Sequence, residues 1–131
     1  MEVKRTIFEE IIDGEIPSKK VYEDSEFLAF LDIAPVEYGH TLLIPKKRYV
    51  WMQDVPDELI AKIFIKTKEL MLAIKKGLKC DYVQVGIAGD EVPYFHIHLI
   101  PRYLDKKNEG RTSYESSEQM TTYAKKISKA L

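Results

Sequence analysis

The sequence predicts an α+β domain with a mainly antiparallel sheet of about five strands. Along the chain, the expected order is a short helix, several strands, one long helix, a pair of strands and a final helix. Strands and helices grouped in this way are typical of α+β folds. The chain also has 131 residues, of which 45% are hydrophobic, enough for one domain with its own core. Residues 1–131 are therefore expected to form a single domain.

The N-terminal third predicts one short helix and three strands. Thr6 and Glu9 match the S/T-x-x-E capping box, so a helix should run through Ile12. It should stop at Gly14, because glycine tolerates the left-handed backbone that ends many helices. Apolar segments bounded by turn residues then predict three strands, at residues 21–23, 27–32 and 40–44.

The rest of the chain predicts a long helix, a hairpin and a C-terminal helix. Asp54 is a candidate N-cap and Pro56 suits a first turn, so the long helix should start there and continue to about Gly77. A strand at 82–87 and the segment 94–102 would form the hairpin. Apolar residues at helical spacing predict the last helix: Met120, Tyr123, Ala124 and Ile127.

Composition favours a cytoplasmic protein without nucleic-acid or membrane partners. The formal net charge is −1, so no basic excess points to nucleic acid or to an anionic membrane. The sequence has no signal-peptide-like start and no apolar run of about 18 residues that could span a bilayer. A single cysteine, Cys80, argues against an intrachain disulfide framework and a cysteine-rich zinc site.

Two of the three histidines lie two residues apart in an apolar segment. In an extended strand, side chains alternate between faces, so His96 and His98 would share one face with Tyr94. The residues between them are apolar and would face the core: Phe95, Ile97 and Leu99. A strand that carries two imidazoles on one face is a candidate site for chemistry near neutral pH.

Three interpretations of the histidine pair are open from the residues alone. The pair could be structural, with each ring hydrogen-bonded in the fold. It could bind a metal with His40 as third ligand, helped by the carboxylate of Asp90 or Glu91. It could also act at phosphorus, where one histidine attacks and the other holds phosphate oxygens.

Residues 89–102, which read GDEVPYFHIHLIPR, resemble the signature His-φ-His-φ-His-φ-φ of the histidine-triad (HIT) family, where φ is apolar. Further blocks resemble the family at residues 7–18, 27–35 and 39–47. The similarity runs from about Thr6 to Arg102 and is greatest to the Hint-like branch and its bacterial relatives. It implies a HIT-like fold with one long helix packed on the sheet, a core at about 6–104, and a C-terminal segment, 105–131, where the resemblance fades.

The resemblance implies a role for each matching residue. His96 would attack the α-phosphorus, His98 would help to hold the phosphate, His40 would lie near the site, and Asp32 would bind the ribose hydroxyls. The phosphate would also meet backbone amides in the segment that holds Glu91 and Val92. Six apolar residues match the slot for the base: Ile7, Phe8, Ile11, Phe30, Ile33 and Leu42. The family resemblance also implies a homodimer and chemistry without a cofactor or metal.

This chain departs from the family pattern at several positions. Tyr94 stands where the signature has its first histidine, and a tyrosine cannot act as acid or base near neutral pH because its pKa is around 10. Asp90 stands where many relatives have glutamine. Thr6 and Glu9 replace a cysteine pair that binds zinc in some bacterial relatives, which argues against a structural zinc of that kind.

The sequence therefore predicts a purine nucleotide phosphoramidase or nucleotidyl hydrolase that forms a covalent nucleotidyl-histidine at His96 and releases a nucleoside monophosphate. The alternative is a nucleotide-binding protein of the same fold in which Tyr94 leaves weak catalysis or none. Two further hypotheses carry less weight: a diadenosine polyphosphate hydrolase, and a metal site on His40, His96 and His98.

Overall fold

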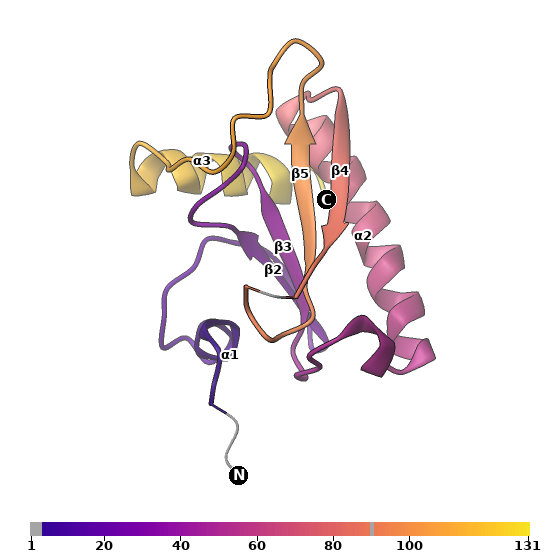
Figure 1. Cartoon of the computed structure of the whole chain (residues 1–131). Helices are drawn as coiled ribbons and strands as arrows, with labels where there is room; N and C mark the ends of the chain where they lie inside the picture. Colours follow the sequence, from indigo (N-terminus) through magenta and orange to yellow (C-terminus); the bar gives the residue numbers. More distant parts are fainter. Residues whose placement is uncertain (1–3, 90) are drawn as a thin grey trace.

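The computed structural model describes residues 4–89 and 91–131, which form a five-stranded antiparallel sheet with helices on both faces (Figure 1). The strands lie in the order β1-β2-β3-β5-β4. The predicted α+β class is confirmed. The elements are α1 (Ile7–Ile12), β1 (Lys20–Glu23), β2 (Phe27–Leu31), β3 (Thr41–Pro45), α2 (Asp57–Leu78), β4 (Tyr82–Ile87), β5 (Ile97–Arg102) and α3 (Ser117–Ser128).

The two faces of the sheet pack against different helices because side chains alternate along each strand. On β2, Phe27, Ala29 and Leu31 belong to the larger core, which includes α2 and α3. Leu28 and Phe30 belong to a second cluster on the opposite face, which includes Phe8 and Ile11 of α1. The sheet therefore separates a thick helical layer from a thinner side that carries only α1.

The helix α1 begins as the sequence predicts. The Thr6 hydroxyl accepts a hydrogen bond from the Glu9 amide, and the Glu9 carboxylate accepts one from the Thr6 amide. Gly14 follows with a left-handed φ of 80°. Both ends of this short helix are thus determined by local residues.

The start of α2 differs from the prediction that Asp54 is its N-cap. Asp54 closes a 3-10 turn at Met52–Asp54, and Pro56 is the cap residue, with no side-chain hydrogen bond. Val55 lies between turn and helix in an extended conformation, because its buried side chain belongs to the core under α2. At the other end Gly77 lies inside the helix. Glycine is needed there because a Cβ would lie 2.2 Å from the Lys126 carbonyl oxygen of α3.

The histidine strand is shorter than predicted, but its side chains alternate as expected. Pairing in β5 begins at Ile97, and the residues before it form a turn in which the Tyr94 amide donates to the Val92 carbonyl. Tyr94 nevertheless lies in the cluster with α1, whereas Phe95 lies in the larger core. The face of each residue is therefore set before regular pairing starts.

The C-terminal segment returns across the end of the sheet before it enters α3. Its path is visible as the orange loop beyond β5 (Figure 1). The Thr112 amide donates to the Pro35 carbonyl, and the Tyr114 hydroxyl accepts from the Gly39 amide. The segment is thus fastened to the loop between β2 and β3. Among the described helices, none is both long and apolar enough to cross a membrane.

Candidate active site

A cavity of about 720 Å³ lies on the α1 face of the sheet. Its lining includes residues from α1, from the ends of β2 and β3, from the segment before β5 and from the C-terminal segment. Eleven of the residues that the sequence proposed for the site line it: Ile7, Phe8, Ile11, Phe30, Asp32, Ile33, Leu42, Glu91, Val92, His96 and His98. His40 and Tyr94, the other two, lie behind this lining.

Strand register explains why these side chains meet. Phe30 of β2 is paired with Leu42 of β3, and Leu42 is paired with His98 of β5. Directly paired residues on neighbouring strands point to the same face, so these three form one row across the sheet. Asp32 and His40 lie two residues beyond Phe30 and before Leu42, which gives them the same facing. The Asp32 amide donates to the His40 carbonyl at 2.9 Å and keeps these two ends together.

The His96 ring is oriented by the backbone of Tyr94. His96 is 2% exposed, and its Nδ1 lies 2.6 Å from the Tyr94 carbonyl oxygen. A carbonyl only accepts, so Nδ1 carries the proton and donates it to this hydrogen bond. In the neutral ring, Nε2 then carries a lone pair. The Phe8 ring packs edge-on against the imidazole, with 5.0 Å between the ring centroids, and helps to fix the plane of the imidazole.

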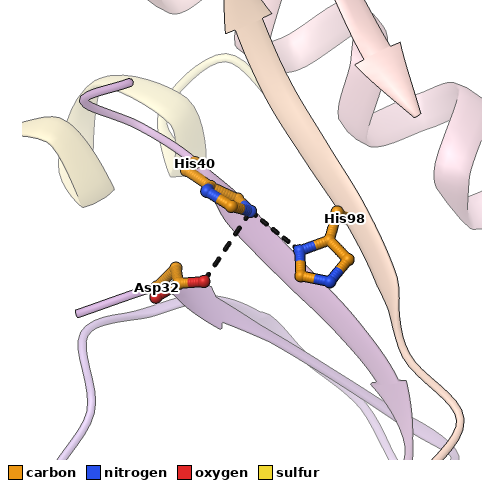
Figure 2. Close-up of side chains that lie close together, drawn as sticks. All are labelled: Asp32, His40 and His98. Carbon is orange, nitrogen blue, oxygen red and sulfur yellow. Dashed lines mark hydrogen bonds and ion pairs between the residues drawn. The ribbon is translucent and has the colours of Figure 1, made fainter. Parts of the chain in front are cut away.

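A second chain of hydrogen bonds orients His98 (Figure 2). The Val36 amide donates to His40 Nδ1 at 3.1 Å, so a neutral His40 carries its proton on Nε2. His40 Nε2 lies 2.9 Å from His98 Nδ1, which must then accept. It follows that neutral His98 carries its own proton on Nε2, the nitrogen not used in this bond. One backbone amide thus sets the tautomers of two histidines.

Burial keeps both of these histidines neutral. It lowers the pKa of His40 to about 4, although the nearby Asp32 carboxylate acts in the opposite direction. Burial also lowers the pKa of His98, and the neighbouring His96 lowers it further. Neutral rings have one donor and one acceptor each, so the tautomers described above are the relevant ones near pH 7.

Asp32 presents its carboxylate to the cavity from the end of β2. Its Oδ1 accepts from the Ala34 amide at 2.9 Å. Its Oδ2 accepts from the Arg111 guanidinium at 3.0 Å and lies 3.7 Å from His40 Nε2. A carboxylate has enough acceptor sites for a pair of hydroxyls, so the position suits a cis-diol. The diol would replace Arg111 as a donor to Oδ2.

The Tyr94 side chain faces the packed cluster, away from the cavity. It is fully buried, and its ring packs edge-on to that of Phe8, with 5.7 Å between the ring centroids. Its hydroxyl donates to the Pro45 carbonyl oxygen. Burial raises its pKa well above that of an ordinary tyrosine. Tyr94 therefore touches His96 through its backbone carbonyl, while its side chain joins α1 to β3.

Thr6 and Glu9 are part of a polar clamp at the start of α1. Arg48 donates to the Glu9 carboxylate at 3.1 Å and to the Pro93 carbonyl at 3.2 Å. The clamp ties α1 to the turn that precedes the histidines. It lies beside Tyr94, whose pKa responds to the charges of Glu9 and Arg48.

The residues that could hold a metal differ from the set His40, His96 and His98. Within the described ranges, the group that gathers ligand atoms is Asp32, His40 and His98, whose atoms lie within 4.8 Å of one another. Two imidazoles and a carboxylate are a donor set that suits zinc. However, His40 Nε2 and His98 Nδ1 are already used in the hydrogen bond between the two rings, and Arg111 neutralises the Asp32 carboxylate. A cation would have to displace both interactions.

Sequence reasoning missed the part of the cavity lining that the C-terminal segment supplies, of which Arg111 and Tyr114 have the clearest roles. Arg111 binds Asp32, and Tyr114 packs in the lining with a hydroxyl pKa that burial raises to about 12. The local sequence gives little sign of either role, because Arg111 follows a polar loop. Gly110, which precedes Arg111, has a left-handed φ of 81°. Asp90 lies outside the described residues.

Comparison with known proteins gives consistent matches. An uncharacterised HIT-like protein of Methanocaldococcus jannaschii is 45% identical over 102 residues, covering 74% of this chain and 78% of that protein. The adenosine 5'-monophosphoramidase of Saccharomyces cerevisiae is 40% identical over 105 residues, covering 76% and 64%. The crystal structure of a Hit-like protein from Bartonella henselae has a TM-score of 0.89 at 33% identity, covering 99% of this chain and 98% of that one.

The HIT domain itself matches residues 13–105. This range contains all five strands, α2 and the three histidines of the site. The fold, the histidine segment and the similar proteins agree, and the chain belongs to the HIT domain family.

Proposed function

We propose that the protein hydrolyses purine nucleotide conjugates and releases a nucleoside monophosphate through a covalent intermediate at His96. The observation that carries the proposal is the opposite orientation of two histidine rings, those of His96 and His98. His96 offers a lone pair on Nε2, because Nδ1 donates to Tyr94, whereas His98 offers a proton on Nε2. A nucleophile and a hydrogen-bond donor on one face of the segment 96–98 can together serve displacement at phosphorus.

The cavity has room and chemistry for the parts of a nucleotide. The base would lie in the apolar part against Phe8, Phe30 and Leu42, and Asp32 would accept from the ribose hydroxyls. The phosphate would then reach His96 and His98, with the backbone amides between 91 and 94 nearby. That the similar yeast protein is an adenosine 5'-monophosphoramidase supports this class of substrate.

The chemistry follows in two balanced steps. His96 Nε2 donates its lone pair to phosphorus, the P–N or P–O bond of the conjugate breaks, and the leaving group takes the electron pair and a proton that solvent supplies. Water then attacks the same phosphorus, the Nε2–P bond breaks, and the proton that water gives up balances the one taken earlier. Nδ1 stays hydrogen-bonded to Tyr94 throughout, which lets the imidazole bear the positive charge of the intermediate.

Turnover of a fluorogenic adenosine phosphoramidate tests this proposal. The wild type should release adenosine monophosphate, and His96→Ala should release none while it still binds adenosine monophosphate in a calorimeter. Retained binding is the control for folding, because the base and ribose contacts do not involve His96. Undiminished turnover by the variant would refute the role of His96. A diadenosine polyphosphate in the same assay tests that alternative substrate.

A nucleotide-binding protein with feeble catalysis is the second candidate, favoured by Tyr94. A Tyr94→His variant separates the two. If turnover rises by orders of magnitude while nucleotide affinity is constant, the native protein is a weakened catalyst. If neither changes, the tyrosine is a tolerated substitution, which agrees with its side chain pointing away from the cavity.

We also propose a homodimer formed through α2 and the neighbouring edge strand β4. Ile65 and Leu72 of α2 are 61% and 62% exposed, and β4 exposes Tyr82, Val85 and Ile87 beside its free edge. Sedimentation should give a dimer for the wild type and a monomer for Leu72→Lys. A monomeric wild type would overturn the proposal.

A further inference from the structure

Arg111 bridges the two sides of the cavity. Its Nη1 donates to Asp32 Oδ2 at 3.0 Å and to the Ala34 carbonyl at 2.6 Å, both at the end of β2. Its Nη2 donates to Glu91 Oε2 at 3.1 Å, in the segment before β5. The Arg111 side chain is 37% exposed and lines the cavity. A guanidinium therefore spans the space between the ribose carboxylate and the segment that leads to the histidines.

The charges of the cavity make this cation important for an anionic substrate. Among the described residues that line the cavity, Asp32 and Glu91 are acidic, and Lys19 and Arg111 are basic. His40 and His98 stay neutral for the reasons given above, so they add no charge. Lys19 lies beside Pro17 and Ser18 at the α1 side of the cavity. Arg111 is the cation in contact with both acidic groups, and it offsets their repulsion of a phosphate.

A bound nucleotide would free part of this guanidinium. The ribose hydroxyls need the Asp32 oxygen that Arg111 now occupies, so binding exchanges one hydrogen bond for another. Arginine has five N–H donors, and its three hydrogen bonds here use three of them. The bonds to Ala34 and Glu91 can hold the group in place while the released donors face the substrate. A planar guanidinium prefers carboxylate, sulfate or phosphate oxygens.

We propose that Arg111 selects nucleotide conjugates whose leaving group carries a negative charge next to the scissile bond. This inference rests on the proposed function and names the substrate class of the same site. A conjugate of adenosine monophosphate with the amine of an amino acid is such a substrate. Its free carboxylate would accept from Arg111, whereas a neutral amine would leave the cation without a new partner. Arg111 is thus a specificity-determining residue, and His96 still performs the displacement.

A matched pair of substrates tests the proposal: the phosphoramidates that join adenosine monophosphate to glycine and to glycinamide. The two differ in one charge and almost nothing else. The wild type should prefer the glycine conjugate. Arg111→Gln should lower kcat/KM for the glycine conjugate about 10-fold or more, with little change for glycinamide, because a charge-assisted hydrogen bond is lost for one substrate only. Arg111→Lys should recover part of the preference.

Two controls make the result decisive. Lys107→Gln removes one charge from the same exposed segment outside the cavity lining and should leave the preference unchanged. Dissociation constants of both conjugates for His96→Ala, with and without Arg111→Gln, measure selection without turnover, so a failure of catalysis is distinguishable from a failure of this inference. Equal effects of Arg111→Gln on both conjugates would overturn it. A gain for both would instead make Arg111 a latch on Asp32.

Discussion

The two faces of the central strands differ in almost every property except their backbone. Toward α2 and α3, β5 presents Ile97 and Leu99, which are fully buried among apolar neighbours. Toward α1, the same segment presents His96 and His98 beside a cavity. One face is filled, while the other holds polar groups that are oriented by backbone hydrogen bonds.

Within one segment, Ile97 and Leu99 contribute to the stability of the core, and His96 and His98 contribute to the cavity. Alternation of side chains gives each residue one neighbourhood only. Substitutions toward α2 should therefore change the free energy of unfolding, and substitutions of cavity-lining residues toward α1 should change turnover. Two substitutions next to each other in the sequence, the response to acid and a substitution at Tyr94 test this separation.

The largest effect is expected at the nucleophile. His96→Ala should lower kcat at least about 10³-fold, which corresponds to about 4 kcal/mol of activation free energy. The melting temperature should change little, because the lost ring borders the cavity. Turnover with the phosphoramidate and a thermal melt measure both quantities. A large fall in melting temperature would mean that the two faces are not separable.

The next largest effect is expected one residue further along, on the other face. Ile97 is fully buried, so Ile97→Ala should cost about 3 kcal/mol of unfolding free energy by leaving a cavity in the core. Its kcat under folding conditions should stay close to that of the wild type. Urea denaturation together with the turnover assay checks this. A loss of kcat in folded protein would contradict the separation.

Acid should lower the free energy of unfolding, because protonation of His40 and His98 opposes folding. The folded pKa of His40 is about 4, below its ordinary 6.5, so the unfolded chain binds more protons between these values. Stability is then present above pH 6.5 and lost as the pH falls, by about 2 kcal/mol between pH 7 and pH 5. His98 acts in the same direction. Urea denaturation at several pH values measures it, and a flat profile over this window would refute a neutral, buried His40.

The smallest of the four effects is expected at Tyr94. Tyr94→Phe removes the hydroxyl that donates to the Pro45 carbonyl, and should cost about 1–2 kcal/mol of stability. Turnover should change little, because phenylalanine keeps the carbonyl that orients His96. The same two assays apply. A kcat that falls by orders of magnitude in folded protein would give the hydroxyl a chemical role.

Much of this arrangement is predictable from the sequence because it depends on local signals. Short sequence patterns predict the capping box of α1 and the five strands, and the spacing of His96 and His98 implies a shared face. The N-cap of α2 was predicted wrongly, since burial of Val55 overrides the local preference for Asp54.

The rest depends on contacts between residues far apart in the chain. Arg111 meets Asp32 across 79 residues, and the Val36 amide sets the tautomers of His40 and His98 through the fold. Neither relation leaves a local pattern. The sequence predicted the face on which Tyr94 lies, but its packing in the cluster under α1, outside the cavity lining, depends on how α1 packs over β3.

The stereochemical course at phosphorus distinguishes a covalent nucleotidyl-histidine from direct attack by water. A conjugate with a chiral phosphorothioate at the α-phosphorus is hydrolysed by the wild type in water enriched in heavy oxygen, and the configuration of the isotopically chiral product is measured. Attack by His96 followed by attack of water is two in-line displacements, so the account predicts overall retention of configuration. Inversion would show a single direct attack by water and would contradict a covalent nucleotidyl-histidine.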